Sequence, residues 1–448
     1  MKHLLLALLM LLNAGCLSLP VGPDELEQNQ EENFEVDTSS IDLNAYGRVF
    51  ISVDGGAMFG VIPLVLFQDL EDTASRNTRD KPQPLYKYVD GFYGISTGAI
   101  ISALLTLPID NGVPATATKA LDFYRTKGKG DEKTKAGIFQ DDYLKEIAEK
   151  THAPQAKQKL RQNFQNASND TFKDSAGQPL PLSSVITRYD GTEKIALGMF
   201  SYRRIASGIA DPNVDSMYIF GGGAFGTNQV KIGHTLANGD ALDKANGVLP
   251  LNVLASDAVQ AAAAVLDIFG EKAVPFPLLG GATQTRYFVD LQDPGSVALA
   301  PDGTQVPALH DPTFIVAQIL KIKYPNEPVT VVSFGTGYKA QDPRTRALTL
   351  ADTPGLKVIR IDPKAKVIDD LIADLHRAAD VLSGKTTAPK DDELRTVAAS
   401  APIRGSFNGF DRLRLIGQNM TRSEDPDYRL YAERILPLFV ALAKHRNP

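Results

Sequence analysis

The first clear pattern after the N-terminal region is an apolar run that ends at a glycine-rich turn. Residues 48–53 (RVFISV) are mostly β-branched or apolar, residues 54–60 (DGGAMFG) are rich in glycine, and residues 61–70 (VIPLVLFQDL) are again apolar. Apolar β-branched runs are typical of buried strands, and glycine-rich segments are typical of turns. These positions therefore predict a strand, a tight turn and a helix in succession.

The same order occurs again in the next part of the chain. Residues 88–93 predict a strand, residues 94–98 (GISTG) a turn, and residues 99–107 a buried helix that stops at Pro108. Two consecutive β-turn-α units favour a parallel sheet with helices on its faces. We therefore expect an α/β protein with three layers, α/β/α, built on a doubly wound and mainly parallel central sheet.

The rest of the chain predicts further elements and two irregular segments. An alanine-rich helix is expected at 256–269, with Ser256 as a plausible N-cap. A polar excursion away from the core is expected at 153–180 and a flexible loop at 221–226. The remaining expected elements are helices at 142–150, 367–382 and 427–444, and strands at 185–188, 194–201 and 329–334.

The first twenty residues have a different pattern. A basic start precedes an apolar run at 4–12, and two small residues then lead to Cys16. The run is too short for a membrane-spanning helix, so residues 1–15 are expected to be a signal peptide. The two small residues and Cys16 at the end of this segment resemble the lipobox of bacterial lipoproteins. The resemblance implies that Cys16 is lipidated and that the chain is exported. The exported chain would be anchored as a lipoprotein in the periplasm or outer membrane, or it would be secreted. Ordinary cleavage, with Cys16 lost or left free, is the alternative.

An acidic segment follows this leader. Residues 23–37 contain seven acidic side chains and no basic one. Such a composition is typical of a solvated segment without a core. We therefore expect an acidic tether over residues 16–45 and a single folded domain over residues 46–448.

Composition and charge exclude several classes of protein. The 448 residues include 47 Lys and Arg against 53 Asp and Glu, which gives a net charge of −6. There is no basic stripe of the kind that nucleic acids require, so nucleic acid is not an expected partner. The single cysteine, Cys16, excludes an intrachain disulfide and a cysteine-ligated zinc site.

The turn at residues 94–98 fits the motif G-x-S-x-G. In this motif the two glycines leave room for a serine on a cramped turn between a strand and a helix, where the hydroxyl stands over the helix N-terminus. The helix dipole there favours the negative charge that develops during acyl transfer. Ser96 is therefore the candidate nucleophile.

A nucleophilic serine also needs donors for the oxyanion. The small residues Gly55, Gly56 and Ala57 allow consecutive backbone N–H groups to point at one carbonyl oxygen. The alternative is a phosphate-binding loop, but neither G-x-x-x-x-G-K-[ST] nor G-x-G-x-x-G fits this turn. An oxyanion hole is the better interpretation.

Four segments together resemble the patatin-like phospholipases in order and spacing. They are DGGAMFGVIPL, YVDGFYGISTGAIISALL, DGTQVPALHDPTF and VVSFGTG, and the resemblance spans about residues 46–337. It implies a lipid acyl hydrolase with a Ser-Asp dyad and an acyl-enzyme intermediate, without a metal or other cofactor. The implied substrates are fatty acyl esters of phospholipids or lysophospholipids at a membrane surface.

The resemblance assigns roles to particular residues. Ser96 matches the nucleophile, Asp302 matches the aspartate base, and Gly55, Gly56 and Ala57 match the oxyanion turn. Protein partners are not indicated by any motif. The lipid substrate and the membrane surface are therefore the expected partners, and protein partners are left open.

The choice of base leaves alternatives open. Asp302 precedes a glycine, and an Asp-Pro pair follows within ten residues, as in the family pattern. Asp290 follows a better strand, RYFVD, but leucine comes after it in place of glycine. His310 comes after Asp302, so a conventional Ser-Asp-His arrangement is formally allowed.

Two departures from the family pattern bear on activity. Ala57 stands where the family has glycine, which is tolerable only if its φ is negative, and Phe59 stands where the family has a basic residue. The missing cation weakens the case for recognition of an anionic phosphate. A catalytically weak lipid-binding or scaffolding protein, or a general carboxylesterase, is therefore the alternative to a phospholipase.

Overall fold

The computed structural model describes the chain from Glu35 onward, with gaps. The elements below belong to the compact unit Asp37–Pro448, which is distinct from the unit Met1–Val36. The described residues are 35–78, 83–130, 134–148, 150, 152–204, 217–223, 231–232, 235–237, 247, 249–291, 297–299, 305–307, 309–338, 341–371, 409–422 and 428–446.

The middle layer is a ten-stranded sheet. Its strand order is β12-β11-β1-β2-β3-β4-β6-β5, and β7 and β8 are attached beside β3. The five strands from β12 to β3 are all parallel. The strands are β1 (Arg48–Val53), β2 (Gly91–Ile95), β3 (Ala196–Arg204), β4 (Met217–Gly223), β5 (Lys231–Ile232), β6 (Thr235–Ala237), β7 (Lys272–Pro277), β8 (Thr283–Val289), β11 (Val329–Phe334) and β12 (Leu356–Ile361), with β9 (Val297–Leu299) and β10 (Gln305–Pro307) paired separately.

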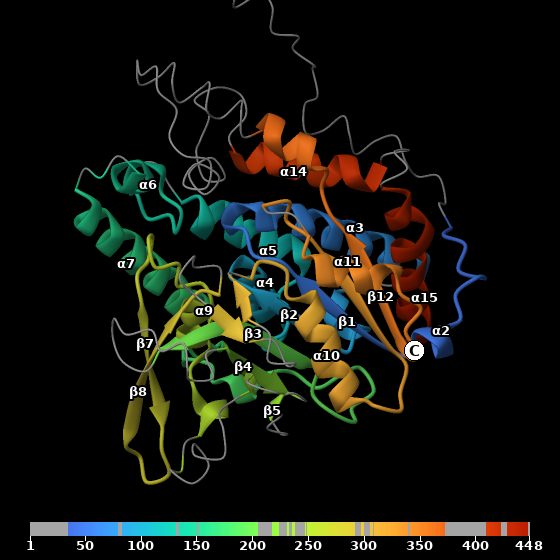
Figure 1. Ribbon diagram of the computed structural model, residues 1–448, viewed down its shortest axis with the longest axis horizontal. Helices are drawn as coiled ribbons and strands as arrows, with labels where there is room; N and C mark the ends of the chain where they lie inside the picture. Colours follow the sequence, from blue (N-terminus) through green and yellow to red (C-terminus); the bar gives the residue numbers. More distant parts are fainter. Residues whose placement is uncertain are drawn as a thin grey trace, which may run out of the picture. The chain divides into compact units, whose positions relative to one another are not determined.

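Helices cover both faces of this sheet (Figure 1). The α-helices are α2 (Leu43–Tyr46), α3 (Val61–Thr78), α4 (Thr97–Leu104), α5 (Ala117–Phe123), α6 (Asp141–Ala148), α7 (Ala153–Thr171), α9 (Ala255–Ala262), α10 (Thr313–Lys323), α11 (Pro343–Leu350), α14 (Gly409–Arg422) and α15 (Leu436–Arg446). Short 3-10 turns lie at Ala57–Gly60, Leu85–Lys87, Leu182–Ser184 and Pro250–Asn252, and π-helical turns at Tyr124–Gly128 and Tyr431–Ile435.

Successive side chains of a strand point to opposite faces of the sheet, and apolar side chains on both faces explain why helices cover both. Phe50 of β1 and Tyr93 of β2 join a buried cluster with Ile315 and neighbouring residues of α10. On the other face, Phe67 of α3 meets Phe334 of β11 edge-on at 4.7 Å between ring centroids. The predicted three-layer α/β/α architecture with a mainly parallel, doubly wound sheet is therefore confirmed.

Several predicted elements match the structure closely, and others differ. The strands at 48–53 and 329–334 and the helix near 142–150 are present. The second strand starts three residues later than predicted, at Gly91. The predicted helix at 367–382 is helical as far as residue 371, and its remainder lies outside the described residues.

The segment 153–180 is not an excursion away from the core, contrary to the prediction. Its first nineteen residues form α7, whose apolar positions recur every four residues and are buried. Phe164 packs against Phe269 at 5.0 Å between ring centroids, and the Arg161 guanidinium donates to the Phe269 carbonyl at 2.6 Å. The polar composition hid a sparse apolar stripe, which is sufficient to hold a helix on the core.

Two smaller predictions are also wrong. The alanine-rich helix begins at Ala255 and ends at Ala262, and Leu254 occupies its N-cap position, so Ser256 lies inside the helix. The glycines at 221–223 form the buried end of β4 and pair with β3. Glycine is tolerated in this strand because residues of β3 and the loop before it approach closely.

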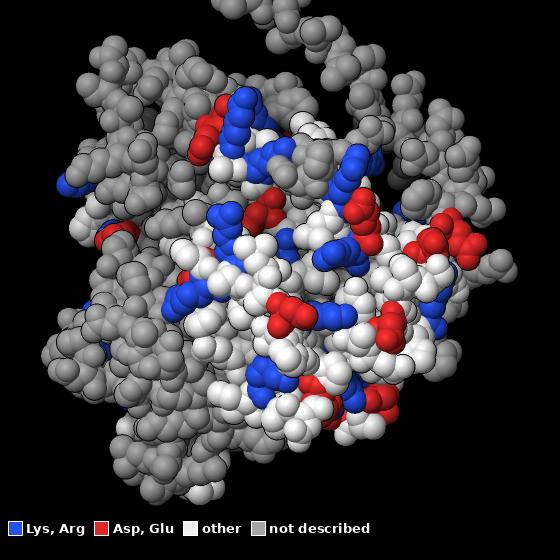
Figure 2. Space-filling model, turned by 45° about the vertical axis from the view of Figure 1, so that its right-hand side comes forward, with Lys and Arg blue, Asp and Glu red and all other residues white. Residues whose placement is uncertain are grey.

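The surface of the described face is mixed in charge. Figure 2 shows basic and acidic side chains interspersed among uncharged ones, and neither sign forms a continuous area on this face. None of the helices in the described ranges combines the length and apolar character needed to cross a membrane.

Glu71 is a buried carboxyl in the middle of α3. Its two side-chain oxygens accept the backbone N–H groups of Leu85 and Ala117 at 3.0 and 2.8 Å. Burial raises the pKa of Glu71 to about 8, although these two hydrogen bonds oppose the shift. The folded protein therefore holds a proton here that the unfolded chain releases near pH 4.5.

This shift predicts the sign of a pH dependence. Because the pKa is raised on folding, the contribution of Glu71 to stability is complete below about pH 4.5 and is lost as the pH rises through about 8. We expect the free energy of unfolding, measured by urea denaturation, to fall by up to about 1.4 kcal/mol per pH unit more in the wild type than in Glu71→Gln over this window. Equal slopes for the two proteins would contradict the assignment.

Candidate active site

Three loops start side by side at the carboxyl edge of the parallel strands. β1 ends at Val53, which lies opposite Gly94 of β2 and Phe334 of β11. The chain proceeds from β1 to β2 and β3 in one direction, whereas β11 and β12 lie on the other side of β1. Ligands of doubly wound sheets bind at the carboxyl ends of strands where the order reverses in this way. The loops after β1, β2 and β11 are therefore the expected place for a site.

Ser96 occupies a strained turn between β2 and α4. Its backbone has φ 53° and ψ −117°, and the residue is 5% exposed. A positive φ at a residue other than glycine costs about 1–3 kcal/mol and persists only where the surroundings enforce it. Ser96 is the residue before the first turn of α4, so its side chain lies at the positive end of the helix dipole.

The two glycines of this turn are required by close approach. A Cβ atom at Gly94 would overlap the backbone of Gly98, and a Cβ atom at Gly98 would overlap the Val53 carbonyl oxygen. The absence of both Cβ atoms therefore lets α4 start directly against the end of β1. This contact brings Ser96 to the loop that follows β1.

The first two residues of the loop at 54–60 are held by backbone hydrogen bonds to neighbouring segments. The Asp54 N–H donates to the Phe334 carbonyl at 3.1 Å, and the Gly55 N–H donates to the His310 carbonyl at 3.0 Å. The Gly55 carbonyl accepts from Thr336 Oγ1 at 2.5 Å. The Gly55 N–H is thus engaged in this conformation, which leaves the N–H groups of Gly56 and Ala57 as the donors for an oxyanion. Within the described ranges, no backbone carbonyl accepts from either of them.

The two departures from the family pattern have structural explanations. Ala57 has φ 48°, so the expectation of a negative φ is wrong and the turn keeps the left-handed conformation that glycine would favour. Phe59 is fully buried, and its ring lies 5.9 Å from that of Tyr338. A hydrophobic contact with the loop after β11 therefore replaces the cation at this position.

A buried ionic cluster holds Asp54, the first residue of the same loop. Arg360, near the end of β12, donates to both oxygens of Asp54 at 3.0 and 2.5 Å and lies 3.2 Å from Asp311 and 2.6 Å from Asp362. Its side chain is 2% exposed, and those of Asp54 and Asp311 are 5% and 2% exposed. Burial opposes the charge on the guanidinium, but the carboxylates outweigh it and raise the pKa of Arg360. Arg360 is not predicted from the sequence, where its only signal is a charged side chain within the apolar run LKVIRI.

The register of β3 places Asp290 next to Ser96. β2 ends opposite Phe200 of β3, and β8, which runs in the other direction, ends opposite Tyr202. Both lie on the same edge of β3, because β4 pairs with these two residues on the other edge. Two residues of a strand span about 7 Å. Ser96 and Asp290, which follow directly after β2 and β8, therefore leave the sheet at neighbouring points.

Asp290 is fully buried at this point. Its N–H donates to the Ala264 carbonyl at 3.0 Å. The N–H of Leu309 donates to the Leu291 carbonyl at 3.0 Å, so these two leucines lie side by side. Asp302 belongs to the segment between these two leucines and lies outside the described residues.

His310 lies where this segment returns to the core. Its ring is 5.4 Å from that of Tyr338, and its carbonyl accepts from the Gly55 N–H. His310 thus contributes to the loop through its backbone. Within the described ranges, no cluster of three or more His, Cys, Asp or Glu side chains could hold a metal ion.

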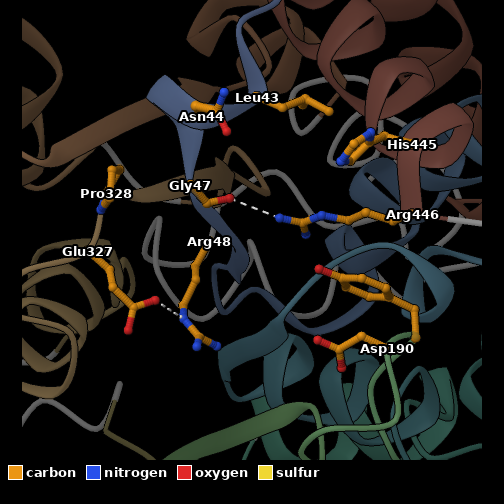
Figure 3. Close-up of a pocket in the computed structure, with 10 residues that line it drawn as sticks. Leu43, Asn44, Gly47, Arg48, Asp190, Glu327, Pro328, His445 and Arg446 are labelled. Atoms are coloured by element: carbon orange, nitrogen blue, oxygen red, sulfur yellow. Dashed lines mark hydrogen bonds and ion pairs between the residues drawn. The ribbon is translucent and has the colours of Figure 1, made fainter.

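A pocket of about 500 Å³ lies at the opposite edge of the sheet (Figure 3). Its ten lining residues include Arg48 at the start of β1, Pro328 just before β11, and Arg446 at the end of α15. Both arginines are engaged there: Arg48 lies 2.6 Å from Glu327, and Arg446 donates to the Gly47 carbonyl at 2.9 Å. None of the ten is Ser, Thr or Cys. The pocket therefore lacks a serine, threonine or cysteine nucleophile, and the carboxyl edge, which has Ser96, is the better candidate for acyl transfer.

Comparison with known proteins finds patatins among the relatives of this chain. Patatin-2-Kuras 2 from Solanum tuberosum is 35% identical over 79 residues, and Patatin group M-3 and Patatin-15 from the same species are each 34% identical over 79 residues. The match covers 17% of this chain and spans a fifth of the length of these relatives. No family model matches the chain. The local similarity supports a patatin-like family.

Proposed function

We propose that this patatin-like chain is a serine acyl hydrolase that cleaves fatty acyl esters of phospholipids or lysophospholipids. The observation that carries the proposal is the strained backbone of Ser96, held between two glycines at the carboxyl edge of the sheet with Asp290 beside it. The local similarity to patatins and the anchored loop after β1 support the same reaction class.

In the proposed mechanism, Ser96 Oγ attacks the ester carbonyl carbon while an aspartate accepts its proton. The oxyanion that forms accepts hydrogen bonds from the N–H groups of Gly56 and Ala57. The carbon–oxygen bond to the alcohol then breaks, and the aspartate returns the proton to the leaving oxygen. Water attacks the acyl-enzyme in the same way and releases the fatty acid, which restores Ser96. The route requires no metal ion.

We take Asp290 as the base in preference to Asp302. The strand register supports this choice, because β2 and β8 end at neighbouring residues of β3 directly before Ser96 and Asp290, and a general base has to lie close to the nucleophile. The family pattern favours Asp302, because glycine follows it and Asp311-Pro312 comes within ten residues. Asp302 remains the alternative, and the two aspartates can be separated by mutation.

The direct test is covalent labelling combined with fatty acid release. A fluorophosphonate probe should form an Oγ–phosphorus bond at Ser96 with loss of fluoride, which mass spectrometry of the full chain detects. The wild type should also release fatty acid from phospholipid and lysophospholipid micelles in the presence of chelator, whereas Ser96→Ala should do neither.

Other outcomes of this test identify the alternative functions. Labelling and turnover of short soluble esters, without release from lipids, would indicate a general carboxylesterase. Absence of labelling and of all turnover, with binding to lipid retained, would indicate a lipid-binding or scaffolding protein and would overturn the proposal.

We also propose that the chain is exported and anchored through an acylated Cys16, which lies outside the described residues. The support is the sequence pattern of residues 1–15 and the acidic segment that follows. Incorporation of labelled fatty acid into the wild type but not into Cys16→Ser is the expected result. Incorporation into both would contradict the proposal.

A further inference from the structure

Tyr124 is a buried tyrosine whose hydroxyl lies against the first residue of α4. This hydroxyl donates to the Thr97 carbonyl at 3.2 Å. Since its single proton is used there, Thr97 Oγ1 donates in the hydrogen bond between the two hydroxyl groups. Burial raises the pKa of Tyr124, so the hydroxyl keeps its proton at neutral pH. One hydroxyl therefore holds both the side chain and the carbonyl of the residue that follows Ser96.

This contact bears on the strained turn at Ser96. The Ser96 backbone has φ 53°, and its side chain makes no capping hydrogen bond to α4. A residue keeps such a conformation only where its surroundings prevent relaxation. Ser96 and Thr97 share a peptide bond, so a change in the Ser96 backbone would move Thr97 away from Tyr124. The two hydrogen bonds therefore oppose relaxation of the turn.

The same hydroxyl also lies close to the end of the turn that follows β1. A Cβ atom at Gly60 would lie 2.6 Å from Thr97 Oγ1 and 3.0 Å from the Tyr124 hydroxyl oxygen. One turn further along, a Cβ atom at Gly128 would lie 3.1 Å from Met58 Sδ. The segment that carries Tyr124 therefore contacts both the turn at the nucleophile and the turn with the proposed oxyanion donors.

A π-helical turn, Tyr124–Gly128, holds this segment in place. The Lys129 N–H donates to the Tyr124 carbonyl at 2.9 Å. The last two carbonyls of the turn accept from the N–H groups of Ile138 and Phe139 at 2.8 and 2.9 Å. π-helical turns are rare and occur mostly at functional sites. The position of the Tyr124 hydroxyl is therefore fixed by backbone hydrogen bonds on both sides of the turn.

We propose that Tyr124 is a positioning residue for acyl transfer, whose hydroxyl holds Thr97 and thereby keeps Ser96 in its strained conformation beside the oxyanion turn. The proposal rests on the proposed function, because it assigns a role in the reaction of Ser96. Tyr124 acts through Thr97 and exchanges no proton with the substrate.

Tyr124→Phe removes the hydroxyl and keeps the ring. In the full chain acting on a short soluble ester, we expect kcat to fall roughly tenfold, the factor that corresponds to the loss of such hydrogen bonds. KM should change little, because the variant leaves the substrate-binding surface intact. The rate of covalent labelling of Ser96 by the fluorophosphonate probe should fall by the same factor, since labelling uses the same hydroxyl.

Tyr88→Phe is the matched control. Tyr88 is also buried, and its hydroxyl donates to the Gln83 carbonyl at 3.3 Å, but it precedes β2 at the opposite edge of the sheet. Both variants lose a buried hydrogen bond, so both should lower the thermal stability. Only Tyr124→Phe should lower kcat and the labelling rate. Wild-type values in Tyr124→Phe, or an equal fall in both variants, would overturn the proposal.

Thr97 gives a second pair of variants. Thr97→Ser keeps the hydroxyl that donates to Tyr124 and should keep kcat near that of the wild type. Thr97→Val keeps the shape of the side chain without the hydroxyl, and kcat should fall. Its loss should not multiply with that of Tyr124→Phe, because both remove one contact. Full multiplication, or equal kcat in the two Thr97 variants, would contradict the proposal even if Tyr124→Phe did not fold.

Amide hydrogen exchange over residues 94–104 separates this proposal from the proposed function, because it needs no turnover. Exchange there should be faster in Tyr124→Phe than in the wild type and unchanged in Tyr88→Phe. Failure of the wild type to react with the probe or with any ester would overturn the proposed function. The exchange result would then still decide whether Tyr124 holds the turn, and equal exchange in both variants would show that it does not.

Discussion

Replacing Asp290 by asparagine is expected to lower kcat for ester hydrolysis by roughly 10²- to 10⁴-fold, the range of a positioned general base. Asparagine keeps the size of the side chain but cannot accept the Ser96 proton. Since the change leaves the substrate-binding surface intact, KM should change little. Steady-state kinetics on a soluble ester measures both quantities.

Asp302→Asn is the matched control for this prediction. If Asp290 is the base, Asp302→Asn retains activity within a few-fold of the wild type. The reverse result, with Asp302→Asn inactive and Asp290→Asn active, would assign the base to the segment between Leu291 and Leu309. Thermal unfolding of both variants checks that the loss does not come from misfolding.

The second large effect is expected at Arg360. Arg360→Met removes the only guanidinium in contact with Asp54, Asp311 and Asp362 among the described residues, and leaves three carboxylates without it. Breaking a buried ion pair by removing one partner costs about 3–5 kcal/mol. We expect a loss of this size in the free energy of unfolding, measured with urea at neutral pH.

Arg125→Met is the control for this change. Arg125 pairs with Asp122, but both side chains are more than half exposed, at 63% and 54%. An exposed pair contributes at most about 1 kcal/mol. If Arg360→Met lowered the free energy of unfolding by no more than Arg125→Met does, the buried cluster would not stabilise the fold.

Arg360 is also a positioning residue for the proposed oxyanion donors. It holds Asp54, and the donors Gly56 and Ala57 follow two and three residues later. In Arg360→Lys, which keeps a charge but loses the bidentate contact, kcat should fall while KM changes little. A variant that lost stability but kept kcat would show that the cluster acts on stability alone.

The carboxyl-edge loops could be predicted from the sequence because their determinants are local. A strand, a glycine-rich turn and an apolar helix follow one another within residues 48–70, and again within residues 88–107. Only glycine fits where residue 98 meets the Val53 carbonyl, because a Cβ atom there would overlap it. The close approach of the two backbones therefore accounts for this glycine of the motif. The strained turn at Ser96 therefore appears in both the motif and the structure.

The position of Asp290 depends on distant pairing and could not be predicted in this way. Its place next to Ser96 results from two strands that approach the same edge of β3 from opposite directions. No local pattern encodes that pairing. The glycine after Asp302 is a local signal, and it favours a base in a part of the chain that lies outside the described residues.

Arg360 and α7 escaped prediction for different reasons. The ionic cluster joins Asp54 to a residue 306 positions away, so neither partner has a visible neighbour in the sequence. In α7 the buried residues are few among many polar ones, and only their spacing of four shows which face is covered. Composition was a poor guide in that segment, whereas periodicity would have been a better one.

The hydrogen bond between Leu309 and Leu291 makes the segment between them a separable module. Leu291 and Leu309 are both buried and bonded to each other, so the two ends of the segment are held together whatever lies between them. Closing a longer or shorter loop changes the entropy only slowly with length. Insertions and deletions in this segment can therefore accumulate during evolution, or be introduced by design, while Asp290 and the loop after β1 keep their places.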